Sequence, residues 1–558
     1  MATVKQLIDN FVWEHLEYYI SLVDKDGEDT VIEGVRVLDE PEKFVHGALV
    51  NATAQLYIHY VKTGDTRAEV TLKRLNRFIG FIKDQPCKTW GKLSILRALG
   101  SLKDASLLDS IAPETLEMLK IKTDYSDFFD KEKMHLKGQA SNYNQVAMAC
   151  AGFRELVGFE NEGYCDAIKE KLLGIMSSGA IDGWMDENFP FGRFDRYSMI
   201  VTSELSDTLD SVHKPLPDSA AENLRKMAKI CIFMANKKGD GINYGRSLSC
   251  HGDCACLEAL ASAFRRGLVD EADKDVALAY SVKILEKTLS FWYNSEKRSF
   301  DIWWNGRSTN RYRQSHRVLE VNLDMAMHLL ATLTNFELAG LADTEPKDVI
   351  PSPKDWEALE IPFKLGKGET AKTFVFRKND TLVMLPLIGI GSMYTASAYQ
   401  PYPAICGVLE AAPEAKMPFL VPEYTLSGGT KARPIQYYDS AALTKEGKKL
   451  TVTANGTLCL MGDRLPAKAD GAFTSVFTFE GDSVTAVFTA DADVTGVETV
   501  IGIHNENDVI TPYGFDASEE LVTKDVYDFM TPHGAIVKAA LYKKNGGGAI
   551  GYTAKIPL

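Results

Sequence analysis

The spacing of hydrophobic residues changes once along this 558-residue chain, near a proline-rich stretch, and that change constrains the fold most. From residue 5 to about 335, apolar residues recur every three to four positions, as in amphipathic helices. Leu7, Phe11, Leu16 and Ile20 form the first such face. Beyond residue 357 the apolar residues alternate with a period of two, which is typical of strands with one buried face. The sequence therefore predicts a helical N-terminal part and a β-structured C-terminal part.

Further helical stripes follow the first one throughout the N-terminal part. They lie near residues 47–62, 67–83, 91–100, 113–121, 142–157, 163–177, 197–212, 219–236, 247–266, 272–293 and 316–335. Helices this numerous, with strand-like alternation nearly absent, predict stacked helical hairpins that close into a ring or extend as a solenoid. No strict sequence period recurs, which argues against a consensus repeat array.

The stretch 339–356 is rich in proline and glycine and predicts a linker between two domains. Short β runs follow it, separated by Gly, Asp and Asn turns, at 373–376, 381–385, 450–453, 475–479, 484–488 and 535–539. Many short strands without intervening helices predict an antiparallel β-sandwich. We therefore expect a helical domain over 1–338, the linker, and a sandwich over 357–558. The stretch 391–425, rich in Tyr and Pro, is expected to cross back toward the helical part.

Composition excludes several classes of partner. A net charge of −14 argues against nucleic acid and against an anionic membrane surface as general partners. No apolar run reaches the length of a membrane span. Nine scattered cysteines, and no basic segment followed by an apolar run after Met1, predict reduced thiols in a cytoplasmic protein. The sequence indicates no cofactor and leaves the oligomeric state open.

Two polar loops between helical stripes stand out as candidate functional sites. The first, 182–197, carries two arginines, four carboxylates, an amide and a tyrosine. The second, 241–251, has the sequence Gly-Ile-Asn-Tyr-Gly-Arg-Ser-Leu-Ser-Cys-His. Loops held on a rigid scaffold are where binding and catalytic groups concentrate. We expect these two loops to face one cleft.

The predicted architecture and two motifs resemble the polysaccharide lyases of the hyaluronate, chondroitin and alginate lyase type and their heparinase II relatives. The stretch 245–250 is similar to a Gly-Arg-Ser-Ile-Ser-Arg motif of that family, apart from Cys250 at its last position. Tyr197 lies nine residues after Asn188, where the family has a catalytic histidine followed by a catalytic tyrosine. The Tyr-Gly-Arg-Ser-Leu stretch 244–248 and the later stretch 397–402 also resemble a bacterial family known mainly as a domain of unknown function.

The resemblance implies an (α/α) toroid and cleavage of uronate-containing oligosaccharides or polysaccharides by β-elimination. Tyr197 would act as base and acid, and Arg246 would lower its pKa or bind the substrate carboxylate. An amide from Asn144 or Asn142 would stabilise the developing carboxylate dianion. His251 would replace the histidine that the family has at the position of Asn188.

The same resemblance suggests which residues bind the sugar. Trp184, Tyr143 and Tyr244 would stack on sugar faces, Asn188 would assist the amide, and Arg193 and Arg196 would supply positive charge. Five further basic residues, which could bind an anionic sugar or form a solvated face, are Arg307, Arg311, Arg313, His316 and Arg317.

Each candidate has a structural alternative. Tyr197 could only pack at a helix start, Arg246 could pair with Asp240 or Asp253, and Asn142 is by type a good N-cap. His251 could likewise be non-catalytic. The stretch 250–256 contains three cysteines, a histidine and an aspartate, but it lacks the paired Cys-x-x-Cys spacing of structural zinc sites. We therefore predict helix-packing thiols there and no metal.

Two other functions stay open at this stage. A glycoside hydrolase of the glucuronidase kind could use an acid–base pair from the available carboxylates, which are Asp182, Asp186, Glu187, Asp195 and Asp253. A non-catalytic carbohydrate-binding protein is the third possibility, although a high density of titratable groups in two loops argues against it. A lyase product is unsaturated, whereas a hydrolase product has gained one water molecule.

Overall fold

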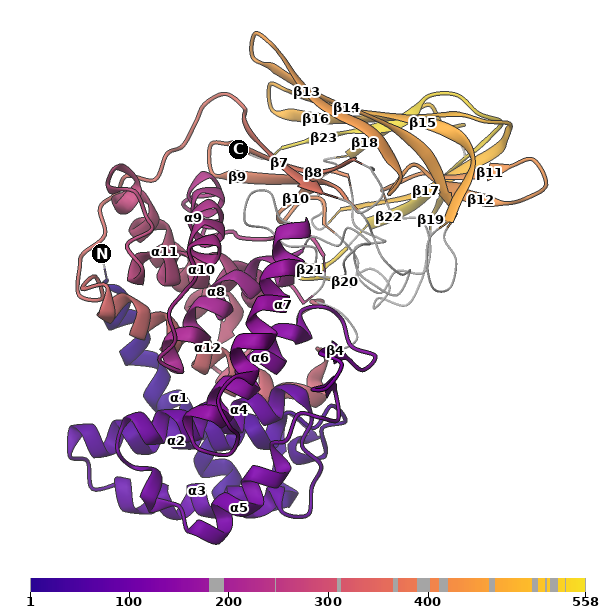
Figure 1. Ribbon diagram of the computed structural model, residues 1–558. Helices are drawn as coiled ribbons and strands as arrows, with labels where there is room; N and C mark the ends of the chain where they lie inside the picture. Colours follow the sequence, from indigo (N-terminus) through magenta and orange to yellow (C-terminus); the bar gives the residue numbers. More distant parts are fainter. Residues whose placement is uncertain are drawn as a thin grey trace.

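Helices occupy the N-terminal part of the chain and antiparallel strands the C-terminal part, as predicted (Figure 1). Three hairpins with two-residue strands interrupt the helical part, at β1 (Val31–Ile32) with β2 (Val35–Arg36), β3 (Phe129–Asp130) with β4 (His135–Leu136), and β5 (Tyr293–Asn294) with β6 (Ser299–Phe300). The computed structural model describes residues 2–179, 195–245, 247–308, 313–364, 370–388, 402–410, 420–460, 467–503, 510–516, 519–521, 530–536 and 538–556.

Six helices pack side by side and close an inner ring. They are α2 (Val45–Thr63), α4 (Thr89–Asp104), α6 (Tyr143–Leu156), α8 (Arg196–Ser211), α10 (Cys250–Arg265) and α12 (Val318–Leu338). Each contacts the next in this order, and α12 returns to α2. Burial is nearly continuous along α10, from Cys250 to Phe264, because neighbours surround it on all sides. The helical part is therefore a closed toroid rather than an open solenoid.

The remaining long helices form an outer layer, consisting of α1 (Val4–Asp26), α3 (Ala68–Ile82), α5 (Pro113–Lys122), α7 (Tyr164–Gly179), α9 (Asp218–Phe233) and α11 (Lys274–Lys287). Helix α3 packs on α2, α7 on α6, α9 on α8 and α10, and α11 on α10. Helix α3 has the single apolar stripe of a surface helix. Its buried residues include Leu75, Phe78, Ile79 and Ile82. Since outer and inner helices alternate along the chain, the inner helices run in one direction. Their N-terminal ends lie together at one end of the ring.

Two helix boundaries differ from the predicted ones for local reasons. The predicted helix 247–266 begins only at Cys250, because Ser247 and Ser249 have positive φ angles of 53° and 66°. Such angles are incompatible with a right-handed helix. The predicted helix 272–293 ends at Lys287, and a π-helical turn continues over Thr288–Trp292.

The strands form one antiparallel network. Its members are β7 (Glu357–Lys364), β8 (Thr370–Lys378), β9 (Thr381–Leu387), β10 (Ala404–Ile405), β11 (Glu423–Leu426), β12 (Lys431–Arg433), β13 (Tyr438–Glu446), β14 (Lys449–Leu460), β15 (Ala467–Glu480), β16 (Ser483–Asp491), β17 (Val494–Ile503), β18 (Ile510–Tyr513), β19 (Glu519–Leu521), β22 (Lys538–Asn545) and β23 (Ile550–Lys555). A separate hairpin pairs β20 (Met530–Thr531) with β21 (Gly534–Ala535).

The network branches at β14, which pairs with β12, β13 and β15, so that two layers of strands enclose one core. One branch continues from β15 through β16 to β23, a second runs through β12, β11 and β17 to β22, and a third runs from β13 through β8 and β9 to β10. Side chains of β14 and β16 alternate between buried and less buried positions, as the period of two predicted. The ring of Phe376 stacks on that of Phe479 with centroids 3.7 Å apart.

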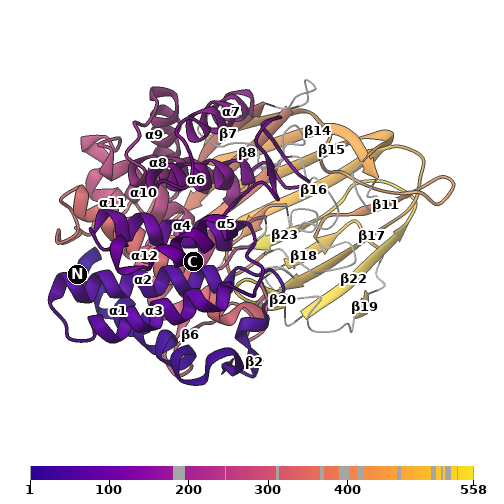
Figure 2. The same ribbon diagram turned by 60° about the horizontal axis from the view of Figure 1, so that its bottom comes forward.

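The helical and β-structured parts lie side by side in both ribbon views (Figures 1 and 2). Arg377 Nη1 on β8 donates a hydrogen bond to the Phe233 carbonyl oxygen at 3.0 Å. Asn243 Nδ2 donates to the Ala404 carbonyl oxygen at 3.4 Å. Ala404 belongs to the stretch expected to cross back, and this part of it does contact the helical region.

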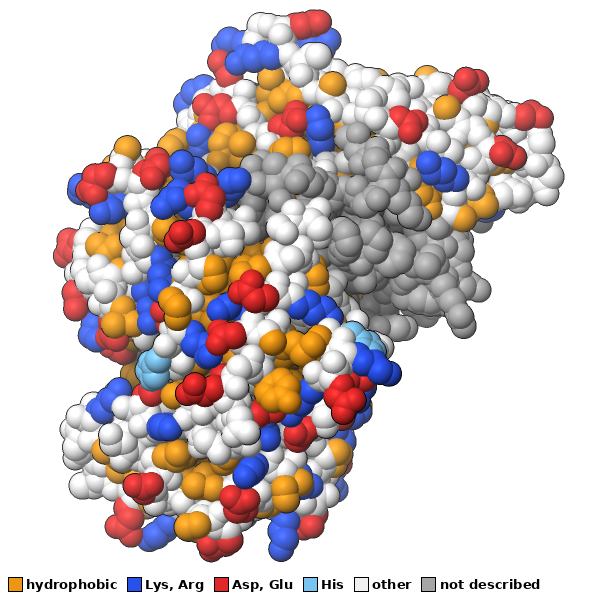
Figure 3. Space-filling view, viewed as in Figure 1, with side chains coloured by type: hydrophobic (Ala, Val, Ile, Leu, Met, Phe, Trp, Pro, Cys, Tyr) orange, Lys and Arg blue, Asp and Glu red, His pale blue; other side chains and the backbone are white. Residues whose placement is uncertain are grey.

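Acidic and basic side chains are interspersed over the face of the molecule seen in Figure 3. In the part of the chain that the structure describes, none of the helices combines the length and the apolar character that a membrane crossing requires.

Candidate active site

Tyr197 lies at the N-terminal end of inner helix α8, and its hydroxyl reaches the second polar loop. Asp195 caps this helix: its Oδ1 accepts a hydrogen bond from the Tyr197 backbone N–H at 2.9 Å. The Tyr197 ring is half-buried, and its hydroxyl donates to Ser247 Oγ at 3.0 Å. The end of the first loop and the centre of the second therefore meet at this hydroxyl pair.

The backbone of the second loop is held in an unusual conformation beside Asp195. Gly245 has a φ angle of +92°, and a Cβ atom there would lie 2.6 Å from Asp195 Cβ, so only glycine fits. Ser247 and Ser249 also have positive φ angles. Each such backbone conformation raises the free energy of the folded state by about 1–3 kcal/mol. The Gly241 N–H donates to Asp253 Oδ1 at 2.7 Å. Surrounding packing fixes this loop in a conformation that it would not adopt in isolation.

Arg196 places a buried positive charge beside Tyr197. Its side chain is only 2% exposed, and its Cζ lies 4.9 Å from the centre of the Tyr197 ring. Arg196 Nε donates to the His251 carbonyl oxygen at 2.8 Å. Its Nη1 is buried and has no hydrogen-bond partner among the described residues. A guanidinium with an unfilled donor is suited to a carboxylate partner.

His251 is enclosed at the start of α10 and is neutral. Its Nε2 lies 2.7 Å from Arg313 Nη1 and therefore accepts a hydrogen bond. Burial and the adjacent Arg313 guanidinium hold the pKa of His251 well below its ordinary value. The ring proton consequently sits on Nδ1, which faces Cys250 Sγ at 3.5 Å. Both ring nitrogens of His251 therefore have protein neighbours.

An ion-paired network continues from His251 toward the centre of the ring. Asp324 Oδ2 lies 3.7 Å from His251 Nε2 and 3.4 Å from His328 Nε2. His328 Nδ1 in turn lies 2.9 Å from Glu258 Oε1. Although burial lowers the pKa of His328, Glu258 and Asp324 raise it to about 10, so the imidazole is positively charged. Despite burial, the charged His328 holds the pKa of Asp324 well below its ordinary range.

The two asparagines at the start of α6 differ in their partners. Asn144 Nδ2 donates to the Ser141 carbonyl oxygen at 2.8 Å. Asn142 occupies the N-cap position, but its side chain makes no capping hydrogen bond, so the expected N-cap role is wrong. Asn142 Oδ1 and Asn144 Oδ1 are both buried and have no hydrogen-bond partner in the described part of the chain. A buried amide of this kind needs water or a ligand as its partner.

The aromatic candidates lie in different environments. Tyr143 is half-buried, and its ring packs edge-to-face on Trp90 with centroids 6.2 Å apart. Tyr244 is completely buried, and its hydroxyl lies 3.3 Å from Thr373 Oγ1 of β8. Tyr244 therefore packs between the helical and β-structured parts and presents no ring face to a sugar. Four further candidates, Trp184, Asn188, Arg193 and Arg246, lie outside the described residues.

Three of the described basic residues between 307 and 317 lie beside acids. Arg317 Nη2 lies 2.6 Å from Glu320 Oε1, and His316 Nε2 lies 3.2 Å from Glu42 Oε2. Arg307 lies 3.7 Å from Asp301, and Arg313 lies against His251 as described above. Arg311 lies outside the described residues.

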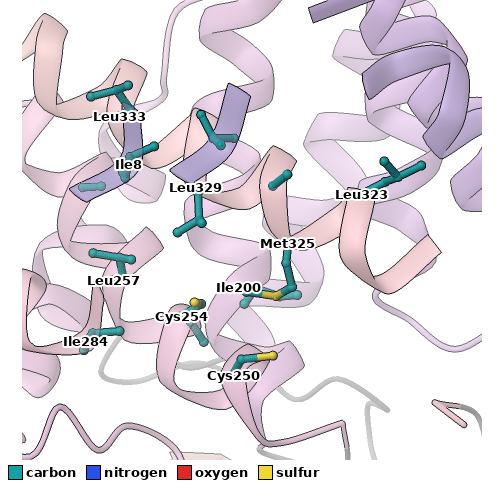
Figure 4. Close-up of a cluster of buried hydrophobic side chains, with 14 of the residues drawn as sticks. Ile8, Ile200, Cys250, Cys254, Leu257, Ile284, Leu323, Met325, Leu329 and Leu333 are labelled. Atoms are coloured by element: carbon teal, nitrogen blue, oxygen red, sulfur yellow. The ribbon is translucent and has the colours of Figure 1, made fainter. Parts of the chain in front are cut away.

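The thiols at the start of α10 belong to a hydrophobic cluster. Figure 4 shows Cys250 and Cys254 beside Ile200 and Met325, from neighbouring inner helices. Burial raises the pKa of Cys254 well above its ordinary value. This environment agrees with the prediction that these cysteines pack in the core.

Two of the acids proposed for hydrolysis have structural partners. Asp253 Oδ2 accepts a hydrogen bond from Trp292 Nε1 at 2.7 Å and lies 2.8 Å from Lys287 Nζ. Asp195 caps α8, as described above. The other three, Asp182, Asp186 and Glu187, lie outside the described residues.

A cavity of about 260 Å³ lies deeper in the ring, between the second halves of the inner helices. Its lining includes Glu204, Asp207, Glu258 and His328. Asp207 accepts hydrogen bonds from Ser262 Oγ at 2.8 Å and Asn335 Nδ2 at 3.0 Å, and burial raises its pKa to about 6. Burial also raises the pKa of Glu204. Sequence inspection missed these carboxylates because they occupy ordinary positions within long helices.

Comparisons with known proteins give structural similarities only. No protein-family model and no curated protein matches the sequence. A chondroitinase AC lyase is 9% identical over 99% of this chain and 83% of its own, with a TM-score of 0.47. A possible member of the GH105 family from Salmonella enterica is 13% identical over 57% of this chain and 93% of its own, with a TM-score of 0.38. A heparinase III is 9% identical over 94% of this chain and 92% of its own, with a TM-score of 0.26. Polysaccharide lyases and glycoside hydrolases are thus both among the solved structures to which this chain is similar.

Proposed function

We propose that the protein is a carbohydrate-active lyase that cleaves uronate-containing oligosaccharides or polysaccharides by β-elimination, with Tyr197 as base and acid. The observation that carries this proposal is the half-buried Tyr197, whose hydroxyl contacts Ser247 and whose ring lies beside the buried cation of Arg196. A phenol has a reference pKa of about 10, so it needs an adjacent positive charge to act as a base. Arg196 supplies such a charge.

In the proposed reaction, the Tyr197 phenolate removes the hydrogen at C5 of the uronate. The electron pair forms the C4–C5 double bond as the C4–O4 bond breaks, and Tyr197 returns the proton to O4. This exchange requires that the C5 hydrogen and the leaving oxygen lie on the same side of the ring. Negative charge develops on the carboxylate, and amide or guanidinium donors stabilise it.

Asn142 and Arg246 are the donors that we assign to the substrate carboxylate. Both amide oxygens are buried without a partner among the described residues, but Asn144 Nδ2 already donates to the Ser141 carbonyl oxygen. Asn142 is therefore the better candidate of the two. We assign His251 to positioning Arg313, because its ring is enclosed.

We keep a sugar-stacking role for Tyr143, here with Trp90, and omit Tyr244 because it is completely buried. The substrate-binding roles of Trp184, Asn188 and Arg193 rest on the sequence resemblance alone.

A second candidate function is hydrolysis in the deeper cavity. A hydrolase needs one carboxyl group that stays protonated as general acid and a second carboxylate. Asp207, with its pKa raised to about 6, and Glu204 line that cavity. The raised pKa of Asp207 is the observation that favours this alternative.

A panel of uronate oligosaccharides separates these functions. We expect the wild-type protein to form products with the ultraviolet absorbance of an unsaturated uronate. Tyr197→Phe should abolish that signal, and Asp207→Asn should retain it. The hydrolase would be favoured if the wild type and Tyr197→Phe form products that absorb no ultraviolet light, while Asp207→Asn forms no products. Sugar binding without cleavage would favour a carbohydrate-binding protein.

A further inference from the structure

Three side chains that commonly bind metals converge where the helical and β-structured parts meet. Asp240 lies in the loop between α9 and α10, Cys406 directly follows β10, and His533 lies in the turn between β20 and β21. One potential ligand atom from each lies within 4.8 Å of the other two. These residues are far apart in the sequence, so no local motif indicated their convergence.

The distance between the cysteine and the histidine fits a tetrahedral metal site. Cys406 Sγ lies 3.5 Å from His533 Nε2. Zinc binds sulfur at about 2.3 Å and imidazole nitrogen at about 2.0–2.1 Å, so tetrahedral angles place the two ligand atoms about 3.6 Å apart. The observed distance is therefore close to that between two ligands of one tetrahedral ion.

The histidine is supported on its far side by a carboxylate. His533 Nδ1 lies 2.7 Å from Glu410 Oε1. Glu410 is held in turn by the Gly407 N–H at 2.8 Å and by Thr531 Oγ1 at 3.2 Å. A carboxylate behind a metal-binding histidine orients its ring. Here the contact with Glu410 is an ion pair without hydrogen-bond geometry, and Nε2 faces Cys406.

The surrounding charges also favour a cation. Asp240, Asp253 and Glu410 contribute three carboxylates, while Lys287 and Lys238 contribute two ammonium groups. Lys287 Nζ lies 2.7 Å from Asp240 Oδ1 and 2.8 Å from Asp253 Oδ2. A carboxylate has two oxygens, so Lys287 and an ion can share Asp240.

We propose that Asp240, Cys406 and His533 form a binding site for a divalent transition metal of the zinc class, with water as the fourth ligand. Binding displaces the thiol proton of Cys406 to solvent and forms a metal–thiolate bond. The ion would join the loop that precedes α10 to the β-structured part. Because this loop continues to Ser247, the partner of Tyr197, the metal would stabilise the polar loop as well as the junction.

Metal content and a cobalt spectrum test this site. The full-length protein, treated with chelator and dialysed, is loaded with Zn²⁺ or Co²⁺ and measured by elemental analysis. We expect one ion per chain, a thiolate-to-cobalt charge-transfer band in the near ultraviolet, and a higher Tm with Zn²⁺. Cys406→Ser, His533→Gln and Asp240→Asn should each weaken binding by at least about tenfold. Cys87→Ser, at a buried thiol outside the proposed site, is the control and should bind like the wild type.

Alkylation provides a second measurement if a variant folds poorly. In the wild-type protein, Zn²⁺ should slow modification of Cys406 by iodoacetamide, read by peptide mass spectrometry. The proposal is overturned if wild-type protein retains no Zn²⁺, if a folded Cys406→Ser variant binds it normally, or if Zn²⁺ leaves the alkylation rate unchanged.

Discussion

Replacing Tyr197 by phenylalanine removes one oxygen atom and leaves the aromatic ring at the start of α8 in place. Among the described residues, the substitution removes the hydrogen bond from the Tyr197 hydroxyl to Ser247 Oγ, which is 3.0 Å long and partly buried. Such a bond contributes about 0.5–1.5 kcal/mol to the free energy of unfolding. The Phe variant should therefore stay folded, with a slightly lower Tm.

The expected effect on catalysis is larger than this structural loss. A general acid–base group contributes at least about 10²-fold to the rate, which corresponds to about 2.7 kcal/mol in the activation barrier. We expect kcat to fall by that factor or more, with KM nearly unchanged, because the hydroxyl acts mainly in the transition state. The assay is the initial rate of ultraviolet absorbance on a uronate oligosaccharide that the wild type cleaves.

Tyr19→Phe is the matched control for this substitution. The Tyr19 hydroxyl donates to the Arg298 carbonyl oxygen at 2.9 Å, so its removal also deletes one hydrogen bond of the fold. This variant should lose similar stability and keep wild-type turnover. A folded Tyr197→Phe variant with the turnover of Tyr19→Phe would remove Tyr197 from the mechanism.

Three further outcomes are expected. Gly245→Ala should strongly reduce activity, because its Cβ would lie 2.6 Å from Asp195 Cβ at a φ angle of +92°; wild-type turnover would contradict a rigid loop. Arg246→Lys should lose most activity while staying folded, since lysine keeps the charge but not the planar fork, and near-normal turnover would leave Arg246 only a general electrostatic role. Although burial lowers the pKa of His328, its acidic partners raise it from 6.5 to about 10, so its contribution to stability is complete below pH 6.5 and is lost toward pH 10. In urea unfolding experiments, the free energy of unfolding of His328→Gln should fall less between pH 6.5 and pH 10 than that of the wild type.

Periodicity predicted the order of helices and strands because most segments follow a single burial pattern. Helix α3 and strand β16 illustrate this, since each has one consistently buried face. Prediction was wrong where the backbone departs from that pattern, as at Ser247 and Ser249, whose positive φ angles delay the start of α10. The proposed domain boundaries at 338 and 357 stay a prediction, although α12 ends at Leu338 and β7 begins at Glu357.

The candidate site was only partly predictable. The sequence placed Tyr197 and the 241–251 loop at helix starts, and the toroid brings Tyr197 and Ser247 into contact. The network of Glu258, Asp324 and His328 was missed because it requires α10 and α12 to pack together. The spacing of Asp324 and His328, four residues apart on one helix, was the only local signal of it.

The most direct test of the central claim is the mass of the products formed in ¹⁸O-labelled water. Wild-type protein is incubated with uronate oligosaccharides, and the fragments are examined by mass spectrometry. Elimination predicts that the mass of the two fragments sums to that of the substrate, that one fragment absorbs ultraviolet light, and that no ¹⁸O is incorporated. Products that together have gained one molecule of labelled water, and that absorb no ultraviolet light, would contradict the lyase mechanism.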